Sequence, residues 1–222
     1  MEEITMREQV IERIKEEGLI VILRGIAKEK LISLAEAMYE GGVRLLEVTY
    51  SANGQVSDEE TAENIRILAE HFCGRMYIGA GTVFTENQVE LTKAAGGLFI
   101  ISPNTKESVI RKTRGVGLVS LPGAFSPSEI TDAHDYGADF VKVFPVTNLG
   151  AEYIKAIKAP LTHIDMLAVG GINLDNICLY KKAGICGFGI GSNITDKKMI
   201  ADGDWQGITE LAKKYVTAIK GN

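Results

Sequence analysis

The chain has 222 residues, of which 45% are hydrophobic and 24% charged, with 24 Gly, 5 Pro and a formal net charge of −5. These proportions are typical of a folded domain, and they exclude disordered, collagen-like and disulfide-stapled proteins. The acidic balance argues against nucleic acid or an anionic membrane as the main partner, so an anionic substrate would need a local positive site.

The cysteines and the N-terminal segment indicate the compartment. Cys73, Cys178 and Cys186 are not spaced as a disulfide framework or a zinc site, and we expect them to be small buried side chains in a reducing environment. The segment MEEITMREQVIERIKEEG has no apolar core of a signal peptide. No apolar run reaches the ~18 residues of a spanning helix. The sequence therefore predicts a cytoplasmic protein without a membrane partner.

Short apolar runs alternate with longer amphipathic segments along the whole chain. The expected strands are Leu19–Arg24, Val43–Tyr50, Met76–Val83, Leu98–Ser102, Val116–Leu121, Phe140–Pro145, Met166–Gly170 and Gly187–Gly191. The expected helices are Glu2–Glu17, Glu29–Tyr39, Glu59–Phe72, Glu86–Ala95, Lys106–Thr113, Pro127–Tyr136, Glu152–Lys158, Leu174–Lys182 and Asp204–Ile219.

This regular alternation, with no linker rich in Ser or Pro, predicts one α/β domain over residues 1–222 with an all-parallel sheet. Eight strand–helix units most naturally close as a (β/α)8 TIM barrel, with Glu2–Glu17 as an extra N-terminal helix that covers the bottom. A doubly wound open sheet is the alternative. No GxGxxG motif follows the first strand, which weakens a dinucleotide-binding interpretation.

Lys142 is the most unusual residue of the predicted strands. It lies in DFVKVFP, where strand alternation places it on one face with Phe140 and Phe144. A lysine among apolar residues must reach water, pair with a charge or serve a chemical purpose. Two interpretations follow: a lysine that extends to solvent or forms an ion pair, or a desolvated amine that attacks a carbonyl and forms a Schiff base.

Glu47 is the second anomaly, because LLEVTY places a carboxylate within an apolar strand. Alternation puts it on one face with Leu45 and Thr49. If that face lines the mouth of a barrel, Glu47 can meet Lys142 and transfer protons there. The alternative is a buried ion pair of purely structural value.

Glycine clusters follow the last two predicted strands, in AVGGIN and GIGSNI. Barrels often bind phosphate at these two positions, so Gly170, Gly171, Gly191 and Ser192 are candidate phosphate ligands. Turns between strands and helices also need glycine for their geometry alone. Arg24, which ends VILRG, is a candidate cation for the same anionic substrate, although arginines at strand ends are as often simply solvated.

The three histidines do not suggest a metal site. His71, His134 and His163 have no second ligand at helical or strand spacing. We therefore expect no metal and no cofactor.

Six motifs together resemble a known family. GGVRLLEVTY, IGAGTV, FIISPN, LPGAFSPSE, DFVKVFP and VGGI occur, between about Val21 and Ser192, in the order and spacing of the bacterial 2-keto-3-deoxy-6-phosphogluconate (KDPG) and 2-keto-4-hydroxyglutarate (KHG) aldolases. The resemblance implies a metal-independent class I aldolase on a (β/α)8 barrel, usually a homotrimer. It implies that Lys142 is the Schiff-base lysine and Glu47 the general acid/base, and that Thr82 lines the pyruvate pocket. Gly170, Gly171 and Ser192 are similar to the family's phosphate cradle.

Two positions depart from the pattern of the better-known family members. An arginine that holds the pyruvate carboxylate is replaced by Ser51, and a threonine before GGI is replaced by Val169. Both changes concern substrate recognition, whereas Lys142 and Glu47 are retained.

The resemblance implies cleavage of a 2-keto-4-hydroxy acid, which we expect to be KDPG, to pyruvate and glyceraldehyde 3-phosphate, with KHG as a further substrate that would yield pyruvate and glyoxylate. Three alternatives stay open at this point. One is the galactonate epimer of KDPG as the substrate, one is a phosphate-binding isomerase without covalent catalysis, and one is a non-catalytic module that binds sugar acids.

Overall fold

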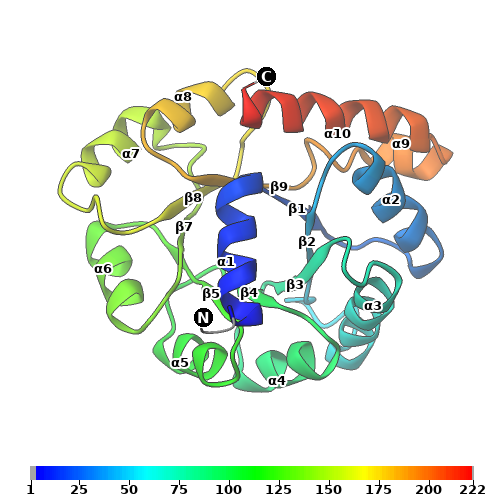
Figure 1. The fold of residues 1–222 in the computed structure, drawn as a ribbon, viewed down its shortest axis with the longest axis horizontal. Coiled ribbons are helices and arrows are strands. Elements are labelled where there is room, and N and C mark those ends of the chain that lie inside the picture. Colours follow the sequence, from blue (N-terminus) through cyan, green and yellow to red (C-terminus); the bar gives the residue numbers. More distant parts are fainter. Residues whose placement is uncertain (1–3, 222) are drawn as a thin grey trace.

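The computed structural model describes residues 4–221, which form a ring of parallel strands surrounded by helices (Figure 1). The strands are β1 (Leu19–Leu23), β2 (Leu45–Thr49), β3 (Tyr77–Gly81), β4 (Phe99–Ile101), β5 (Val119–Leu121), β6 (Gly123–Ala124), β7 (Val141–Val143), β8 (Met166–Val169) and β9 (Gly187–Ile190). The helices are α1 (Met6–Glu17), α2 (Lys28–Glu40), α3 (Asp58–His71), α4 (Glu86–Ala94), α5 (Glu107–Gly115), α6 (Pro127–Asp135), α7 (Gly150–Lys158), α8 (Ile177–Lys182), α9 (Lys197–Asp202) and α10 (Trp205–Lys220).

The sheet is parallel throughout, and its order is β5-β4-β3-β2-β1-β9-β8-β7-β6. The two outermost strands, β5 and β6, are consecutive in the chain and are separated only by Pro122. Because proline has no N–H, it interrupts the hydrogen-bond ladder at that point. The Pro122 carbonyl still accepts a hydrogen bond from the Lys142 amide at 2.8 Å. β5 and β6 thus act as one broken strand that closes the ring, and the predicted barrel is confirmed.

Some element boundaries differ from those expected. The fifth expected strand begins three residues too early, because Val116 and Gly117 form the turn after α5, where Gly117 has φ +78°. The helix expected from Leu174 begins only at Ile177. The sequence did not predict α9, which has six residues.

Helix α1 lies across the end of the ring at which the strands begin (Figure 1). Thr5 and Glu8 form a capping box at its start, and Gly18 ends it with φ 62°. Val10 and Ile14 are buried against residues from inside the barrel, among them Ile20 and Leu45. The predicted extra helix therefore covers the bottom, although positions 2 and 3 of its expected range lie outside the described residues.

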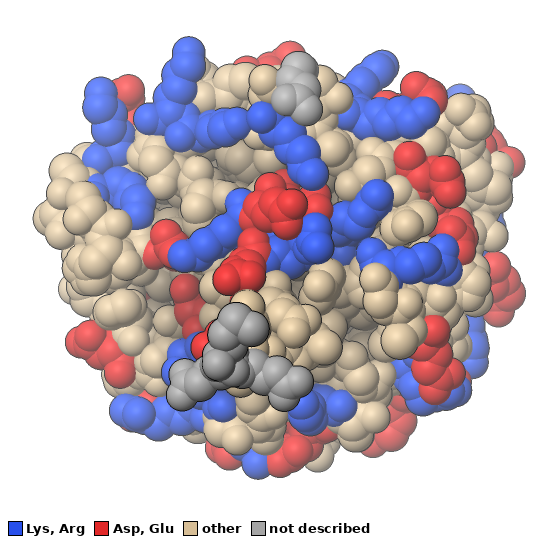
Figure 2. All heavy atoms as spheres, viewed as in Figure 1, with Lys and Arg blue, Asp and Glu red and all other residues tan. Residues whose placement is uncertain are grey.

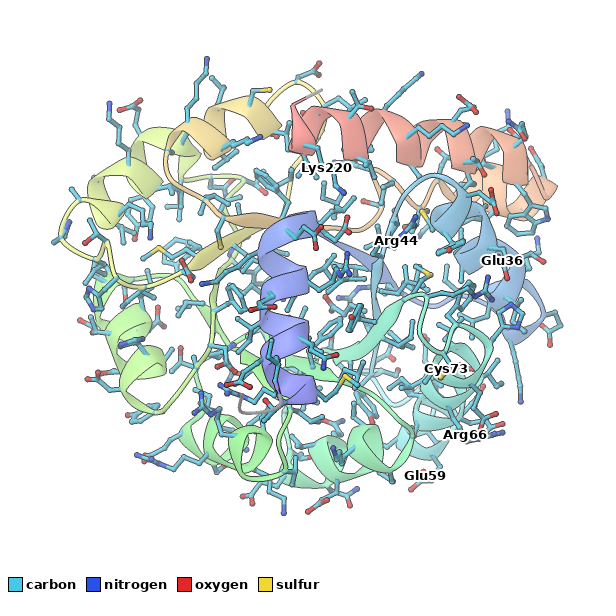
Figure 3. The ribbon with its side chains drawn as sticks, in the orientation of Figure 1. Glu36, Arg44, Glu59, Arg66, Cys73 and Lys220 are labelled. Atoms are coloured by element: carbon cyan, nitrogen blue, oxygen red, sulfur yellow. The ribbon has the colours of Figure 1, made fainter. Side chains whose placement is uncertain are left out.

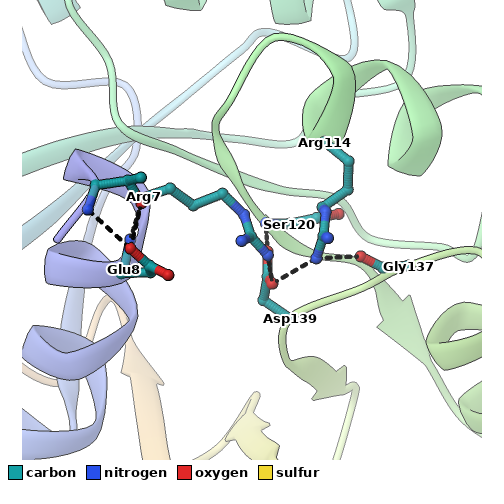
Figure 4. A network of polar contacts seen from close by, with 7 residues as sticks. Arg7, Glu8, Arg114, Ser120, Gly137 and Asp139 are labelled. Atoms are coloured by element: carbon teal, nitrogen blue, oxygen red, sulfur yellow. Dashed lines mark hydrogen bonds and ion pairs between the residues drawn. The ribbon is translucent and has the colours of Figure 1, made fainter. Parts of the chain in front are cut away.

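Ion pairs attach α1 to the strand starts. The Asp139 carboxylate, whose side chain is only 5% exposed, accepts hydrogen bonds from Arg7, Arg114 and the backbone amide of Ser120 (Figure 4). Acidic and basic side chains are interleaved across the centre of this face (Figure 2). The bottom of the barrel is thus closed by a helix with an apolar inner side and a charged outer side.

None of the three cysteines is fully buried, so the expectation is wrong for Cys73 and Cys178 and only partly met by Cys186. Cys73 is exposed in the turn after α3 (Figure 3), and Cys178 is exposed on the outward side of α8, whose inward residues are Ile177 and Tyr180. Cys186 is half-buried, and burial raises the pKa of its thiol to about 11. Within residues 4–221, no helix combines the length and the apolar character needed to cross a membrane.

Candidate active site

A cavity of about 740 Å³ opens at the carboxyl ends of the strands, where barrel enzymes place their chemistry. All but one of the site residues predicted from the sequence line it. They are Arg24, Thr82, Lys142, Gly170, Gly171, Gly191 and Ser192. The remaining residue, Glu47, is buried in β2 and does not line the cavity.

Lys142 is the middle residue of β7 and pairs in register with Gly123 on one side and Leu167 on the other. Its side chain is 6% exposed, and its Nζ lies 4.7 Å from the centre of the Phe144 ring. Burial disfavours the ammonium form and therefore lowers the pKa of Lys142. The amine at the cavity wall is thus disposed to be neutral, which is the nucleophilic form.

Glu47 occupies the space above a glycine of the next strand. It pairs in register with Ile22 and Gly79, and its side chain is 1% exposed. A Cβ atom on Gly81 would overlap the Glu47 carboxyl group, so the missing side chain at position 81 is what allows the carboxyl to lie there. Burial raises the pKa of Glu47, and the opposing positive charges of Lys142 and Arg24 offset only part of that rise.

The Lys142 amine and the Glu47 carboxyl group interact electrostatically. Lys142 lowers the pKa of Glu47, and Glu47 raises the pKa of Lys142, so each favours the charged form of the other. At both residues burial has a larger effect on the pKa than this attraction. The pKa of Glu47 is therefore raised and that of Lys142 lowered, and each shift favours the neutral form. A neutral amine beside a carboxyl group that can gain or lose a proton suits nucleophilic attack followed by proton transfer.

Arg24 and Thr82 form the third part of the site. Arg24 follows β1, and its Nη2 donates a hydrogen bond to Thr82 Oγ1 at 3.3 Å. Thr82 follows β3 and has φ 57°, a left-handed conformation that β-branched residues rarely adopt. Its side chain is 8% exposed. The exposed Arg24 guanidinium brings a permanent positive charge to the mouth of the cavity, where a carboxylate could bind it.

The two predicted glycine clusters follow the neighbouring strands β8 and β9 and line the same cavity. Gly170 and Gly171 have φ +94° and +76°, and a side chain at Gly171 would press against Thr147. Asn193 links the two loops, because its Nδ2 donates to the Ile172 carbonyl at 2.8 Å. The structure therefore brings the predicted phosphate ligands into one turn-lined recess next to Lys142.

The two departures noted in the sequence have different positions. Val169 lines the main cavity, whereas Ser51 lines a separate cavity of about 360 Å³ and donates a hydrogen bond to Asn53 at 2.7 Å. Arg24 borders both cavities.

Among the lining residues of the main cavity that the sequence did not predict, Lys197 is the charged one. It lies five residues beyond Ser192, and its position at the cavity depends on how the chain turns after β9. The only available signal was a positive charge shortly after GIGSNI.

The histidines are less scattered than their sequence spacing indicates. The rings of His134 and His163 pack edge to face with centres 5.3 Å apart, and His71 Nε2 lies 2.6 Å from Glu36 Oε1. Across residues 4–221, no three or more His, Cys, Asp or Glu side chains gather in a way that could hold a metal ion.

Comparison with known proteins gives a consistent result. The family described as KDPG and KHG aldolase matches residues 10–211. A probable 2-dehydro-3-deoxy-6-phosphogalactonate aldolase of Rhizobium meliloti is 37% identical over 84% of this chain and 85% of its own. The 2-dehydro-3-deoxy-6-phosphogalactonate aldolase of Escherichia coli is 30% identical over 91% and 96%.

A solved structure also matches. The KDPG aldolase of Legionella pneumophila superposes with a TM-score of 0.79 and 29% identity, covering 90% of this chain and 94% of that one. In that structure pyruvate is captured at low pH as a covalent carbinolamine intermediate.

Proposed function

The chain belongs to the KDPG and KHG aldolase family, and from that premise we propose that this lyase cleaves 2-keto-3-deoxy-6-phosphogluconate to pyruvate and glyceraldehyde 3-phosphate. The observation that carries the proposal is the buried Lys142 amine, whose pKa is lowered, at the wall of a cavity that also contains the glycine recess. KHG, which would yield pyruvate and glyoxylate, is a further substrate of the same chemistry.

In the proposed mechanism, the neutral Lys142 amine attacks the C2 ketone and gives a carbinolamine, which loses water to form a protonated imine. The imine draws the electron pair of the breaking C3–C4 bond into an enamine. The covalent pyruvate of the Legionella relative supports such an intermediate. After C3 of the enamine has been protonated, water hydrolyses the resulting imine, which releases pyruvate and restores the amine.

Glu47 would perform the proton transfers. As the C3–C4 bond breaks, its carboxylate takes the proton of the C4 hydroxyl, directly or through one water, and the aldehyde is released. The same carboxyl group then returns a proton to C3 of the enamine. The raised pKa of Glu47 suits both steps, because the group must accept and donate a proton within one cycle.

The pyruvate carboxylate needs a cation other than the arginine replaced by Ser51. We assign this role to Arg24, which borders the main cavity and is oriented by Thr82. A guanidinium can hold a carboxylate by two parallel hydrogen bonds. Gly170, Gly171, Gly191 and Ser192, which line the same cavity after β8 and β9, would bind the phosphate.

The galactonate epimer is a second candidate substrate, since the Rhizobium meliloti and Escherichia coli relatives described above are named for it. The epimers differ at C4. Val169 lines the cavity without a hydroxyl group, so it cannot hydrogen-bond a substrate hydroxyl in one epimer only. Apolar contacts discriminate between similar substrates far less than hydrogen bonds do. We therefore expect both epimers to be cleaved.

Borohydride trapping tests the covalent step. Incubation with pyruvate and borohydride should place a reduced pyruvyl adduct on Lys142 and abolish activity, while Lys142→Ala should give no adduct and no turnover. Full activity after this treatment would favour an isomerase without covalent catalysis. Ligand binding that survives Lys142→Ala in a protein without any turnover would favour a binding module.

A coupled assay of pyruvate release tests the substrate. We expect release from KDPG and from its galactonate epimer, and slower release from KHG. Equal or faster rates on KHG alone would contradict the assignment of the glycine recess to phosphate.

The proposal also includes the location predicted from the sequence and the oligomeric state implied by the resemblance. We place the enzyme in the cytoplasm, in the Entner–Doudoroff type of sugar-acid breakdown, as a homotrimer. Sedimentation equilibrium should then give about 72 kDa, three times the 24.1 kDa of one chain. A mass near that of one chain would contradict the trimer.

A further inference from the structure

Lys197 borders the substrate cavity but has no role in the mechanism described above. It is the first residue of α9 and lines the same cavity as Gly170, Gly171 and Ser192. Lys197 and its neighbour Lys198 are both exposed, but Lys198 does not line the cavity. The two lysines carry the same charge, but only Lys197 borders the cavity.

The backbone that carries Lys197 is held in place from both ends of α9. The Ile194 and Thr195 amides both donate to the Gly191 carbonyl at 2.9 Å, so the chain turns tightly between the glycine recess and α9. At the other end, Lys30 Nζ donates to the Ile200 and Ala201 carbonyls at 2.7 and 2.8 Å. These contacts stabilise the backbone on both sides of Lys197.

Of the positively charged side chains that line the cavity, one has no role in the mechanism. Arg24 is turned toward Thr82, two strands away from β1 on the side opposite β9, and Lys142 must be neutral to react. Among the described residues that line the cavity, Lys197 is therefore the remaining cation, and it lies on the side of β8 and β9. The adjacent Asp196 carboxylate caps α9, because it accepts a hydrogen bond from the Met199 amide at 2.9 Å.

A phosphate monoester places a strong demand on this side of the cavity. It carries a charge of about −1.5 to −2 at pH 7 and three acceptor oxygens. Backbone amides and the Ser192 hydroxyl satisfy acceptors but bring no full positive charge. A lysine ammonium supplies that charge and binds phosphate as a point charge.

We propose that Lys197 is a specificity-determining residue that binds the phosphate of the substrate and so favours phosphorylated over non-phosphorylated 2-keto-4-hydroxy acids. This inference rests on the proposed aldolase function. Lys197 acts on the end of the substrate remote from the reacting carbons, so Schiff-base formation with pyruvate does not depend on it.

The test compares Lys197→Ala with Lys198→Ala as the matched control and Lys197→Arg as the conservative variant. For KDPG and its epimer, we expect Lys197→Ala to lower kcat/KM about 10- to 100-fold, the range of a hydrogen bond to a charged group. The kcat/KM for KHG and the trapping of pyruvate by borohydride should not change. Lys198→Ala should resemble the parent protein, and Lys197→Arg should recover most of the loss.

An equal loss on KHG, an equal loss in Lys198→Ala, or an unchanged preference in Lys197→Ala would overturn the proposal. Binding of inorganic phosphate, measured by calorimetry, separates this inference from the proposed function. If the parent protein neither traps pyruvate nor cleaves any of the three acids, the aldolase assignment fails. Weaker phosphate binding by Lys197→Ala than by Lys198→Ala would still support the site, and equal binding would refute it.

Discussion

The Glu47 carboxyl group lies in the space left by the missing side chain of Gly81. A substitution that adds one methyl group at Gly81 tests whether the carboxyl needs this space. In Gly81→Ala the new Cβ would overlap the carboxyl, and Glu47 would have to leave its position. We expect kcat to fall by a factor of about 10² or more, the contribution of a positioned acid/base. The fold should lose only about 1–3 kcal/mol, because the displaced group is the end of a flexible side chain.

Gly79→Ala is the matched control, on the same strand and the same face. Its Cβ would overlap the Phe99 ring instead of Glu47. We expect a comparable loss of stability by chemical denaturation but nearly full activity per folded molecule. An active Gly81→Ala variant would show that the position of Glu47 is not required.

The coupling between Glu47 and Lys142 predicts a pH effect of known sign. The Glu47 carboxylate raises the pKa of Lys142 against the larger effect of burial, so Glu47→Gln should lower that pKa further. The neutral amine then persists to lower pH. We expect the acid limb of pyruvate trapping by borohydride to move to lower pH in Glu47→Gln, while aldol cleavage falls by about 10² or more.

The exposed Glu59→Gln serves as the control for this measurement and should leave the trapping profile unchanged. An acid limb that stays in place or moves to higher pH in Glu47→Gln would contradict the coupling.

At the scale of elements, the free energy that each ion pair of α1 contributes depends on how deeply the pair is buried. Asp139 is 5% exposed and accepts hydrogen bonds from two arginines and one amide, so Asp139→Ala leaves all three donors without their partner. We expect a loss of about 2–4 kcal/mol in the free energy of unfolding, measured with urea. Activity per folded molecule should persist, because the active site lies at the opposite end of the barrel.

Asp165→Ala is the comparison for an exposed pair. Asp165 lies 2.7 Å from Lys15, but the two side chains are 37% and 51% exposed. We expect this variant to lose less than about 1 kcal/mol. Similar losses in the two variants would show that burial does not determine the strength of these contacts.

At the scale of the whole molecule, the ring pairs the first strand of the chain with the last one. β1 pairs with β2 on one side and with β9 on the other, and Thr209 of α10 donates a hydrogen bond to the Ala37 carbonyl of α2 at 3.1 Å. Neither half can separate without breaking a parallel ladder and exposing core residues. We therefore propose that residues 1–222 form one cooperative domain.

Trp205, the only tryptophan, reports on the C-terminal part of the chain, whereas circular dichroism reports on all helices. One cooperative domain predicts that both signals follow the same equilibrium transition in denaturant. Two separate transitions would contradict it.

The sequence by itself determined the alternation of strands and helices, the family and the two unusual strand residues. These follow from local rules: apolar periodicity distinguishes strands from helices, and a lysine or glutamate within an apolar strand is visible without a structure. Strand alternation also determines which residues share a face with Lys142 and Glu47.

Only the tertiary structure decided how the ring closes, where the Glu47 carboxyl group lies and which residues line each cavity. These features depend on residues that are distant in the chain. Pro122 divides one strand in a way that still closes the ring, and Gly81 makes room for a carboxyl group from a neighbouring strand. The turns after β9 bring Lys197, but not Lys198, to the cavity, whereas Ser51 borders a different one. Contacts across the sheet and the path of a loop set such positions, and local periodicity carries no information about either.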